Sequence, residues 1–503
     1  MSLARFRRGL LLIPVLLVAA VLLIASGRFL APKHPPAGGP TKTTGSAPIT
    51  LTSVSPKAKE LRDSLKKANL VIVVLDAARA DHFGCYGYPR ETTPNTDRIA
   101  GHSLVFEQHF SQFPHTRTST TSLFTGQYPD THGVLAMKGE IPYDFTLGKA
   151  LQTAGFETAF VSASIVASPV MGIGEDFDYV TARTRGRGRS AQKSTPRRNP
   201  GEVLAEMPRW LDQRKGKRFF AYVHFTQPHK PYNAPKEIQQ LFANSKPPNL
   251  LQGRFVYREI EPLTKNPRMS ARENANLYDA NLRYGDWGVG ELEKILAERK
   301  LLDNTLLIIT SDHGEAFGEH GYLGHREGLY DEHVHIPLVM HFPGGQTPVG
   351  RVRALSETVD ILPTVLDLFA LPIPSTVQGK SLLPLITGER RAVHNFVFAR
   401  AEGTPESYLV RDQHWAMILF KGGKLQALYD LEKDPWQTRN VIAEQPKEAE
   451  RMVAAFKQFA QAQRLPPLDF IDPTWKPTRQ PSASRRKLSE DHKRELKALG
   501  YVD

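Results

Sequence analysis

Cysteine is almost absent from this sequence, because Cys85 is the only one among its 503 residues. A single cysteine excludes a disulfide framework within the chain, so stability has to come from the packing of a large core. Hydrophobic residues account for 40% of the sequence, which is enough to build that core. The sequence shows no internal repeats, and its length allows one large domain with a smaller one attached.

Aromatic residues are missing from the most basic stretches of the chain. The formal net charge is +13, and basic residues crowd a glycine-punctuated stretch within 182–200 and again at Arg485, Arg486 and Lys487. Nucleic-acid-binding segments usually place aromatic side chains among their basic ones or carry a recognisable motif, and neither occurs here. We therefore expect no nucleic-acid partner, and we interpret 182–200 as a solvated inserted loop near anionic lipid or polysaccharide.

Charged residues are also absent from Gly9 to Ala25, an apolar run that follows Arg5, Arg7 and Arg8. Its length is near the lower limit for crossing a bilayer, so residues 9–26 form either a transmembrane anchor or a cleaved signal. The positive-inside rule keeps residues 1–8 in the cytoplasm. We expect membrane anchoring through this N-terminal helix in the cell inner membrane, a flexible linker over 27–64, and a folded body on the extracytoplasmic, periplasmic side.

The remaining sequence alternates between strand and helix patterns, which predicts an α/β fold. Strands are expected at 70–75, 103–106, 157–162, 218–225, 305–310 and 336–341, and helices at 145–154, 203–213, 271–300 and 359–369. From about 391 the pattern changes to short strands and then a helix over 446–463, which predicts a small antiparallel sheet. The expected domains are 65–390 and 391–465, followed by a basic, proline-rich tail over 466–503.

Polar residues that could bind a metal or take part in catalysis follow three of these expected strands. Asp76 ends the first strand, Asp312 and His313 end a later one, and His229 lies in a proline-flanked turn after another. Open α/β sheets bind ligands beyond the carboxyl ends of their strands, so these side chains are expected at one edge. His320 and His325 follow in a glycine-rich loop, and this whole cluster is suited to hold a metal or an anion.

A hydroxyl-rich run from Thr116 to Thr125, ending at Gly126, predicts the start of a helix. Helix N-termini favour anions, because their first backbone N–H groups lack partners within the helix. One hydroxyl can cap the helix while another faces a ligand. A solvated Ser/Thr-rich loop is the alternative interpretation of this run alone.

Several short motifs follow one another along the chain, in the segments 75–82, 84–88, 93–95, 123–129, 131–134, 228–232, 311–315, 359–364 and 378–384. Their order resembles the sulfatase family of the alkaline phosphatase superfamily, over roughly residues 70–503. This resemblance implies a central mixed sheet flanked by helices, with a small C-terminal antiparallel-sheet subdomain. It also implies a catalytic domain over 65–390.

The sequence departs from the family where sulfatases carry their nucleophile. Sulfatases typically have cysteine or serine, converted to formylglycine, ten residues before the glycine that matches Gly126, but here that residue is Thr116. Thr118 and Thr120 stand where the family has proline and arginine. Thr116 instead resembles the threonine nucleophile of phosphoethanolamine transferases, lipoteichoic acid synthases and nucleotide pyrophosphatases. The resemblance therefore implies an unmodified threonine nucleophile, with Thr118 as the alternative.

The expected metal site departs from the family in the same direction. Calcium-binding sulfatases have paired aspartates where this chain has Asp76 and Ala77, and His313 follows Asp312. The implied ligands are Asp76, Thr116, Asp312 and His313. These three oxygens and one nitrogen favour one divalent ion, Zn²⁺ or Mn²⁺, over Ca²⁺, which remains an alternative.

The resemblance also implies roles for residues around the metal. His229 would act as the general acid towards the leaving oxygen, and His325 would stabilise the outer oxygens of the anion. Arg79 and His320 are weaker candidates, which would contact the metal ligands and not the metal itself.

Three functional classes follow from these residues. The first is a metal-dependent hydrolase of sulfate or phosphate esters, exported and membrane-anchored, acting on a sulfated or phosphorylated glycan or lipid. The second is a transferase of phospho groups to lipid or glycan. The third is a non-catalytic protein that binds anionic glycans, and the retained metal set argues against it.

Overall fold

This computed structural model describes residues 55–142, 144–181, 199–214, 216–244, 271–345, 348–403, 406–420 and 426–465. All of them belong to one compact unit within Leu51–Asp503. The expectations for 1–8, for 9–26, for the tail over 466–503 and for nearly all of the basic stretch over 182–200 fall outside the described residues. No helix within the described ranges is long and apolar enough to cross a membrane.

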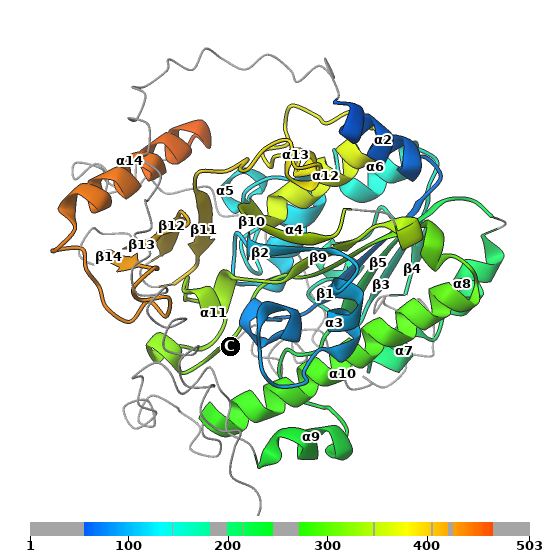
Figure 1. Cartoon of the computed structure of the whole chain (residues 1–503), viewed down its shortest axis with the longest axis horizontal. Helices are drawn as coiled ribbons and strands as arrows, with labels where there is room; N and C mark the ends of the chain where they lie inside the picture. The colour runs from blue at the N-terminus through cyan, green and yellow to red at the C-terminus, as the bar shows by residue number, and fades with distance from the viewer. Residues whose placement is uncertain are drawn as a thin grey trace, which may run out of the picture. The chain divides into compact units, whose positions relative to one another are not determined.

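A mixed sheet forms the centre of the described part of the chain (Figure 1). Its order is β10-β2-β9-β6-β1-β5-β3-β4, and all neighbouring pairs are parallel except those of β9. The strands are β1 (Asn69–Leu75), β2 (Leu104–Phe110), β3 (Glu157–Ser162), β4 (Tyr179–Val180), β5 (Phe219–Phe225), β6 (Thr305–Ser311), β9 (Leu338–His341) and β10 (Gly350–Glu357). β1, β5 and β6 are buried along their whole length, as expected for central strands covered on both faces.

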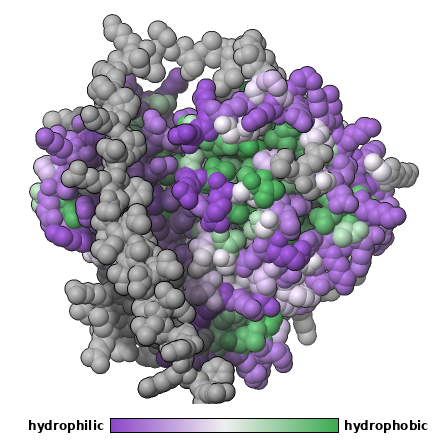
Figure 2. Space-filling model, viewed as in Figure 1, coloured by the Kyte–Doolittle hydropathy of each residue, from purple (hydrophilic) through white to green (hydrophobic). Residues whose placement is uncertain are grey.

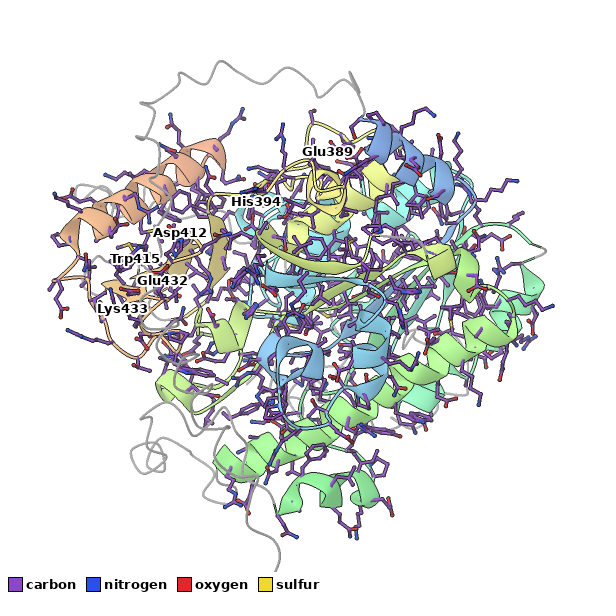
Figure 3. All side chains as sticks on the ribbon, viewed as in Figure 1. Glu389, His394, Asp412, Trp415, Glu432 and Lys433 are labelled. Carbon is purple, nitrogen blue, oxygen red and sulfur yellow. The ribbon has the colours of Figure 1, made fainter. Side chains whose placement is uncertain are left out.

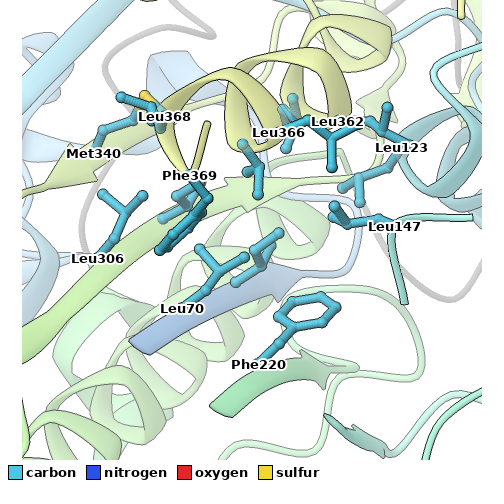
Figure 4. Packing of buried hydrophobic residues seen from close by; sticks show 14 of the residues in the cluster. Leu70, Leu123, Leu147, Phe220, Leu306, Met340, Leu362, Leu366, Leu368 and Phe369 are labelled. Carbon is cyan, nitrogen blue, oxygen red and sulfur yellow. The ribbon is translucent and has the colours of Figure 1, made fainter. Parts of the chain in front are cut away.

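Alternate side chains of β1 enter two different cores, one on each face of the sheet. Leu70, Ile72 and Val74 pack in a core with helices from one face, whereas Val71 and Val73 pack with helices from the other. Figure 4 shows the first core, in which Leu362 and Leu366 of α12 lie over the strands. The helices of this core are α2 (Pro56–Leu65), α4 (Thr116–Thr125), α6 (Leu147–Thr153), α12 (Ile361–Leu368) and α13 (Leu383–Ile386).

The second core is covered mainly by the long helix α10 (Ala271–Glu298), which runs across the sheet in Figure 1. Its partners on that face are α3 (Pro94–Ala100), α7 (Pro200–Leu204) and α8 (Met207–Gln213). α9 (Lys236–Ala243) packs against α10. On the face seen in Figure 2, hydrophobic residues form small separate groups among hydrophilic ones, as is normal for a protein surface.

A second, antiparallel sheet has the strand order β11-β12-β13-β14. Its strands are β11 (Val397–Ala401), β12 (Ser407–Arg411), β13 (Trp415–Phe420) and β14 (Gln426–Asp430). One face packs against Phe110 and Leu355 of the central sheet, and the other against α14 (Pro446–Ala462). The predicted fold class, a central mixed sheet flanked by helices with a small antiparallel sheet near the C-terminus, is confirmed.

Three expectations about individual elements need correction. Residues 56–65 form α2 and pack into the first core, so the predicted linker cannot extend to 64. The helix expected over 203–213 is two helices, and Pro208 in the first turn of α8 explains the break, because proline has no N–H to continue α7. β10 was not among the expected strands, although Arg351 and Arg353 alternate with apolar residues there, as in a half-exposed strand.

Candidate active site

Three parallel strands bring the candidate residues to one edge of the sheet. β1 lies between β5 and β6, and its last residue, Leu75, pairs with Phe225 on one side and with Ser311 on the other. Asp76 and Asp312 therefore follow their strands at the same level. His229 joins them because its backbone N–H donates to the Asp76 carbonyl at 3.0 Å. The predicted convergence of these side chains is present in the structure.

The turn after β1 is tight, which places Asp76 and Asp312 close together. Ala77 has a positive φ of 64°, a conformation that few residues other than glycine adopt. In this conformation the Ala77 N–H donates to Asp312 Oδ1 at 2.9 Å, and the Ala77 carbonyl accepts from the Tyr278 hydroxyl at 2.9 Å. Strained residues of this kind cluster at functional sites, where the surroundings hold them in place.

The hydroxyl-rich run forms α4, as predicted, with Thr116 as its first residue. His115 is the N-cap, and its Nδ1 accepts from the Arg117 N–H at 3.3 Å. At the other end Gly126 adopts the left-handed conformation that closes many helices. Every residue of α4 is buried, so the run is not a solvated loop.

The four predicted ligands face one another. Thr116 Oγ1 lies 3.4 Å from Asp76 Oδ1 and 3.1 Å from His313 Nε2. His313 Nε2 lies 3.8 Å from Asp76 Oδ1 and 3.5 Å from Asp312 Oδ2. Donors at tetrahedral positions around an ion about 2.0–2.1 Å away would stand about 3.3 Å apart, so these separations suit a four-ligand site.

Two further observations indicate that these residues are arranged for a cation. Asp312 Oδ2 is buried and has no hydrogen-bond partner among the described residues, which is costly for a carboxylate unless something else binds it. His313 Nδ1 donates to the Gly314 carbonyl at 2.9 Å, so its other ring nitrogen, Nε2, is the one that faces Thr116 and Asp312. The residues present therefore fit a divalent metal ion.

The charge of the ligand set is consistent with this interpretation. Burial by itself would raise the pKa of Asp312, but the nearby His313 and His224 and the hydrogen bond from Ala77 together hold that pKa below its ordinary value. Asp312 is therefore a carboxylate at neutral pH, the form that binds metal.

His224 is a site residue that the sequence analysis did not identify. It lies on β5, fully buried, with Nε2 at 3.2 Å from Asp76 Oδ2. Asp76, His224 and Asp312 each offer a ligand atom, and these three atoms lie within 4.8 Å of one another. The one available signal was a histidine inside a strand of otherwise apolar and aromatic residues, where a buried imidazole needs a partner.

Three imidazoles form one wall of the site. The rings of His313 and His325 stack with centroids 4.2 Å apart, and the His229 ring stands 4.7 Å from that of His325. His229 Nδ1 donates to the Lys230 carbonyl at 2.5 Å, so its Nε2 is the nitrogen available for proton transfer. Burial and the neighbouring His313 lower the pKa of His325 against the effect of Glu315, which leaves His325 a neutral N–H donor.

The two weaker candidates lie in ionic networks beside the site. Arg79 is buried and pairs with Asp81 and Glu319. It also donates to the Glu315 carbonyl at 3.1 Å, so it supports the loop that carries Glu315, the carboxylate beside His325. The His320 ring stacks on Tyr330 at 3.6 Å between centroids, and its Nδ1 lies 2.7 Å from Glu332 Oε1. The structure brings neither side chain into contact with the four predicted metal ligands.

Thr118, the alternative nucleophile, has a structural partner. Its hydroxyl oxygen accepts from the Ala136 N–H at 2.8 Å, which fixes the loop that follows α5 (Pro129–His132). Thr116 is therefore the hydroxyl of α4 that contacts the predicted metal ligands.

Comparisons with known proteins identify the family to which most of the chain is similar. The family model "Sulfatase" matches residues 68–371, and the model "N-sulphoglucosamine sulphohydrolase, C-terminal" matches residues 318–464. The chain is 23% identical over 442 residues to an arylsulfatase of Clostridium perfringens, covering 75% of this chain and 90% of that protein. It is also 23% identical over 485 residues to an N-acetylglucosamine-6-O-sulfatase of Bacteroides thetaiotaomicron, covering 78% and 86%.

Solved structures share the fold. One, a complex with its substrate D-glucosamine-2-N,6-O-disulfate, has a TM-score of 0.68 at 22% identity and covers 79% of this chain and 98% of its own. The phosphonate monoester hydrolase of Agrobacterium radiobacter has a TM-score of 0.67 at 21% identity, covering 79% and 96%.

The chain belongs to the sulfatase family of the alkaline phosphatase superfamily. It is an enzyme of the sulfate-ester hydrolase class, and the metal dependence of that family matches the ligand groups found here.

Proposed function

We propose that Thr116, unmodified, is the nucleophile of a metal-dependent hydrolase that acts on phosphate esters at least as well as on sulfate esters. The observation that carries this proposal is the place of Thr116 Oγ1, buried and within 3.4 Å of Asp76 Oδ1 and 3.1 Å of His313 Nε2. A hydroxyl among metal ligands at a helix N-terminus is easier to deprotonate than one in water.

We propose Zn²⁺ or Mn²⁺ as the ion, held by Asp76, Thr116, Asp312 and His313. The donor separations of 3.1 to 3.8 Å suit a four-ligand site. Calcium is the less favoured alternative, because it usually binds six to eight oxygens at about 2.3–2.6 Å, and alanine stands beside Asp76 where the paired aspartate would be. When bound, the ion supplies positive charge that stabilises an alkoxide on Thr116.

In the proposed reaction the Thr116 hydroxyl, made more acidic by the nearby cation, loses its proton to water, and its oxygen forms a bond to sulfur or phosphorus. The bond from that atom to the substrate alcohol breaks, and the leaving oxygen takes a proton from His229 Nε2 in its protonated form. The N–H of His325 stabilises the outer oxygens of the anion. A water molecule then gives a proton to the now neutral His229 Nε2 and attacks the sulfur or phosphorus of the threonine ester. The bond from that atom to Thr116 Oγ1 breaks and this oxygen takes a proton from water, which releases the anion and restores both residues.

The threonine ester explains why phosphate esters enter the proposal. A formylglycine hydrate has a second hydroxyl that can expel the bound sulfate, but threonine has none, so its ester is broken by attack on sulfur or phosphorus. The structural likeness to a phosphonate monoester hydrolase supports a phosphorus substrate, and the glycan sulfatases among the relatives support an anionic ester on a glycan. Transfer of the group to a lipid or glycan alcohol instead of water is the second candidate function, since the same ester would serve it.

We also propose that the folded body is exported and stays anchored to the inner membrane. This rests on Arg5, Arg7 and Arg8 before the uncharged apolar run from Gly9 to Ala25.

A panel of sulfate, phosphate and phosphonate esters, assayed on the purified full-length chain with stoichiometric metal, tests the proposed reaction. The turnover of Thr116→Ala should fall at least about 10³-fold, which corresponds to a barrier roughly 4 kcal/mol higher. Thr116→Ser should keep part of the original turnover. Thr153→Ala, at an exposed position of α6, is the matched control and should behave like the original chain. Full activity of Thr116→Ala would refute the proposal, and product formed only in the presence of an alcohol acceptor would assign transfer instead.

A further inference from the structure

The proposed reaction gives no role to His224, although this residue lies against a proposed metal ligand. Its ring is fully buried on β5, in a strand where every residue is buried. An imidazole at such a depth needs hydrogen-bond partners on both nitrogens. Nε2 lies 3.2 Å from Asp76 Oδ2, and Nδ1 lies 3.0 Å from the Tyr222 hydroxyl.

The two oxygens of Asp76 face different groups. Oδ1 lies 3.4 Å from Thr116 Oγ1 and 3.8 Å from His313 Nε2, which is the side of the proposed metal. Oδ2 is on the side of His224. A carboxylate can rotate about its last bond, so a donor fixed on one oxygen restricts that rotation and keeps the other oxygen directed at Thr116.

Tyr222 determines which nitrogen of His224 carries the proton. Its phenol has a pKa well above the ordinary value, because it is buried and lies near Asp312, so it remains an O–H donor at any working pH. If that O–H donates to Nδ1, the ring proton is on Nε2 and points to Asp76. The Tyr222 ring is itself held by Phe160 and Phe124, with centroids 5.0 and 4.9 Å away.

The same atoms allow a competing role, in which His224 binds the metal directly together with Asp76 and Asp312. That role would need a bare Nε2, and would leave Asp76 Oδ2 without its donor. The unpartnered oxygen of the second aspartate, Asp312 Oδ2, lies 3.5 Å from His313 Nε2, which in turn lies 3.1 Å from Thr116 Oγ1, so this buried oxygen is on the side of His313 and Thr116.

We propose that His224 is a positioning residue, which donates its Nε2–H to Asp76 Oδ2, with its tautomer fixed by Tyr222, so that Asp76 Oδ1 faces the metal and Thr116. This inference rests on the proposed metal site. Partners of metal ligands typically contribute 10- to 100-fold to metal affinity, and His224 has that relation to Asp76.

Metal affinity, measured on the purified full-length chain by competition with a chelator for Zn²⁺ and for Mn²⁺, tests this role. His224→Ala should weaken affinity by about 10- to 100-fold. His224→Gln places an amide N–H where Nε2 was and should retain most of the affinity, whereas His224→Asn places it near Tyr222 and should behave like His224→Ala. Tyr222→Phe should weaken affinity in the same direction, and Tyr88→Phe, a buried tyrosine bonded to Asp279, is the matched control that should not.

The outcomes separate this inference from the proposal on which it rests. If His224→Gln lost metal as completely as Asp312→Ala, His224 would be a ligand and the positioning role would be refuted. If His224→Ala bound metal as tightly as the original chain while Asp312→Ala did not, His224 would have no role at the metal. A chain that bound neither ion stoichiometrically before any substitution would overturn the metal site itself. Thermal unfolding of the metal-free variants confirms that each one folds.

Discussion

At the scale of single residues, the orientation of Asp312 determines whether the site can hold a cation. Its Oδ1 accepts from the N–H groups of Ala77 and His313 at 2.9 and 3.0 Å, which leaves Oδ2 free of backbone donors. These two backbone hydrogen bonds and a longer one from the Ser311 hydroxyl at 3.5 Å all go to Oδ1, so Oδ2 is the oxygen that can bind the proposed metal. The backbone thus prepares the coordination geometry before metal binds.

Asp312→Ala and His313→Ala should each abolish metal retention together with turnover, because the loss of one of four ligands leaves an open, weakly held site. Elemental analysis after gel filtration measures the first effect, and ester hydrolysis the second. Asp212→Ala, an exposed carboxylate paired with Arg299, should change neither. Unaltered metal content in Asp312→Ala would show that the assigned site is wrong.

Most residues of the site could be predicted because they follow strands or begin a helix. Asp76, Asp312 and Thr116 stand directly after or at the start of elements whose patterns are clear in the sequence. His224 could not be predicted in this way, since it lies inside β5 and its role depends on Asp76, which follows the neighbouring strand β1. Cross-strand neighbours of this kind are set by strand order, which the sequence pattern does not contain.

At the scale of elements, a buried acidic and histidine cluster joins the two sheets. Glu357 ends β10, Asp360 directly precedes α12, and His394 precedes β11. Figure 3 labels His394, which lies between the core helices and the small sheet. The Glu357 carboxylate accepts from the Phe398 N–H at 2.9 Å and from the Tyr128 hydroxyl at 2.6 Å. His394 Nε2 donates to Asp360 Oδ2 at 2.8 Å, so the cluster connects β10, α12 and β11.

This cluster should make the protein less stable as pH rises. Burial raises the pKa of Glu357 to about 7, although His394 opposes it. Burial by itself would lower the pKa of His394, but the nearby Asp360 and Glu357 raise it by more, so this pKa lies above its ordinary value. Both groups bind protons more tightly in the folded state, so their stabilisation is present at low pH and is lost as pH rises from about 5 to about 8.

The free energy of unfolding should therefore depend less on pH in Glu357→Gln, and its change over that range should be smaller by up to roughly 3 kcal/mol. Urea unfolding of the full-length chain at intervals from about pH 5 to about pH 8 measures it. Glu432→Gln is the control, since Glu432, labelled in Figure 3, lies exposed in the turn after β14 and pairs with His414. The same slope in Glu357→Gln as in the original chain would contradict the assignment.

At the scale of the whole molecule, the sequence predicted the fold class and the approximate place of most strands. It did not predict that β9 is antiparallel within an otherwise parallel sheet, or that β10 pairs with β2 at the edge. These features depend on the pairing of strands far apart in the sequence, which the residue pattern within one segment does not contain.

The proposed export gives a prediction for the complete chain in its cell. Protease added to intact spheroplasts should digest the folded body, whereas residues 1–8 should become accessible only after the membrane is permeabilised. A cytoplasmic protein of the same cells serves as the control for intactness. Protection of the body in intact spheroplasts would show that the proposed orientation is wrong.

The central claim is that Thr116 carries the substrate group during turnover, and mass spectrometry of the peptide spanning Thr116 tests it most directly. Before substrate is added, the peptide should have the mass of ordinary threonine. After an acid quench during turnover of a phosphate ester, it should gain a phosphoryl or substituted phosphoryl mass localised to Thr116, and Thr116→Ala should gain none. An adduct on Thr118, or turnover by Thr116→Ala without any adduct, would contradict the account.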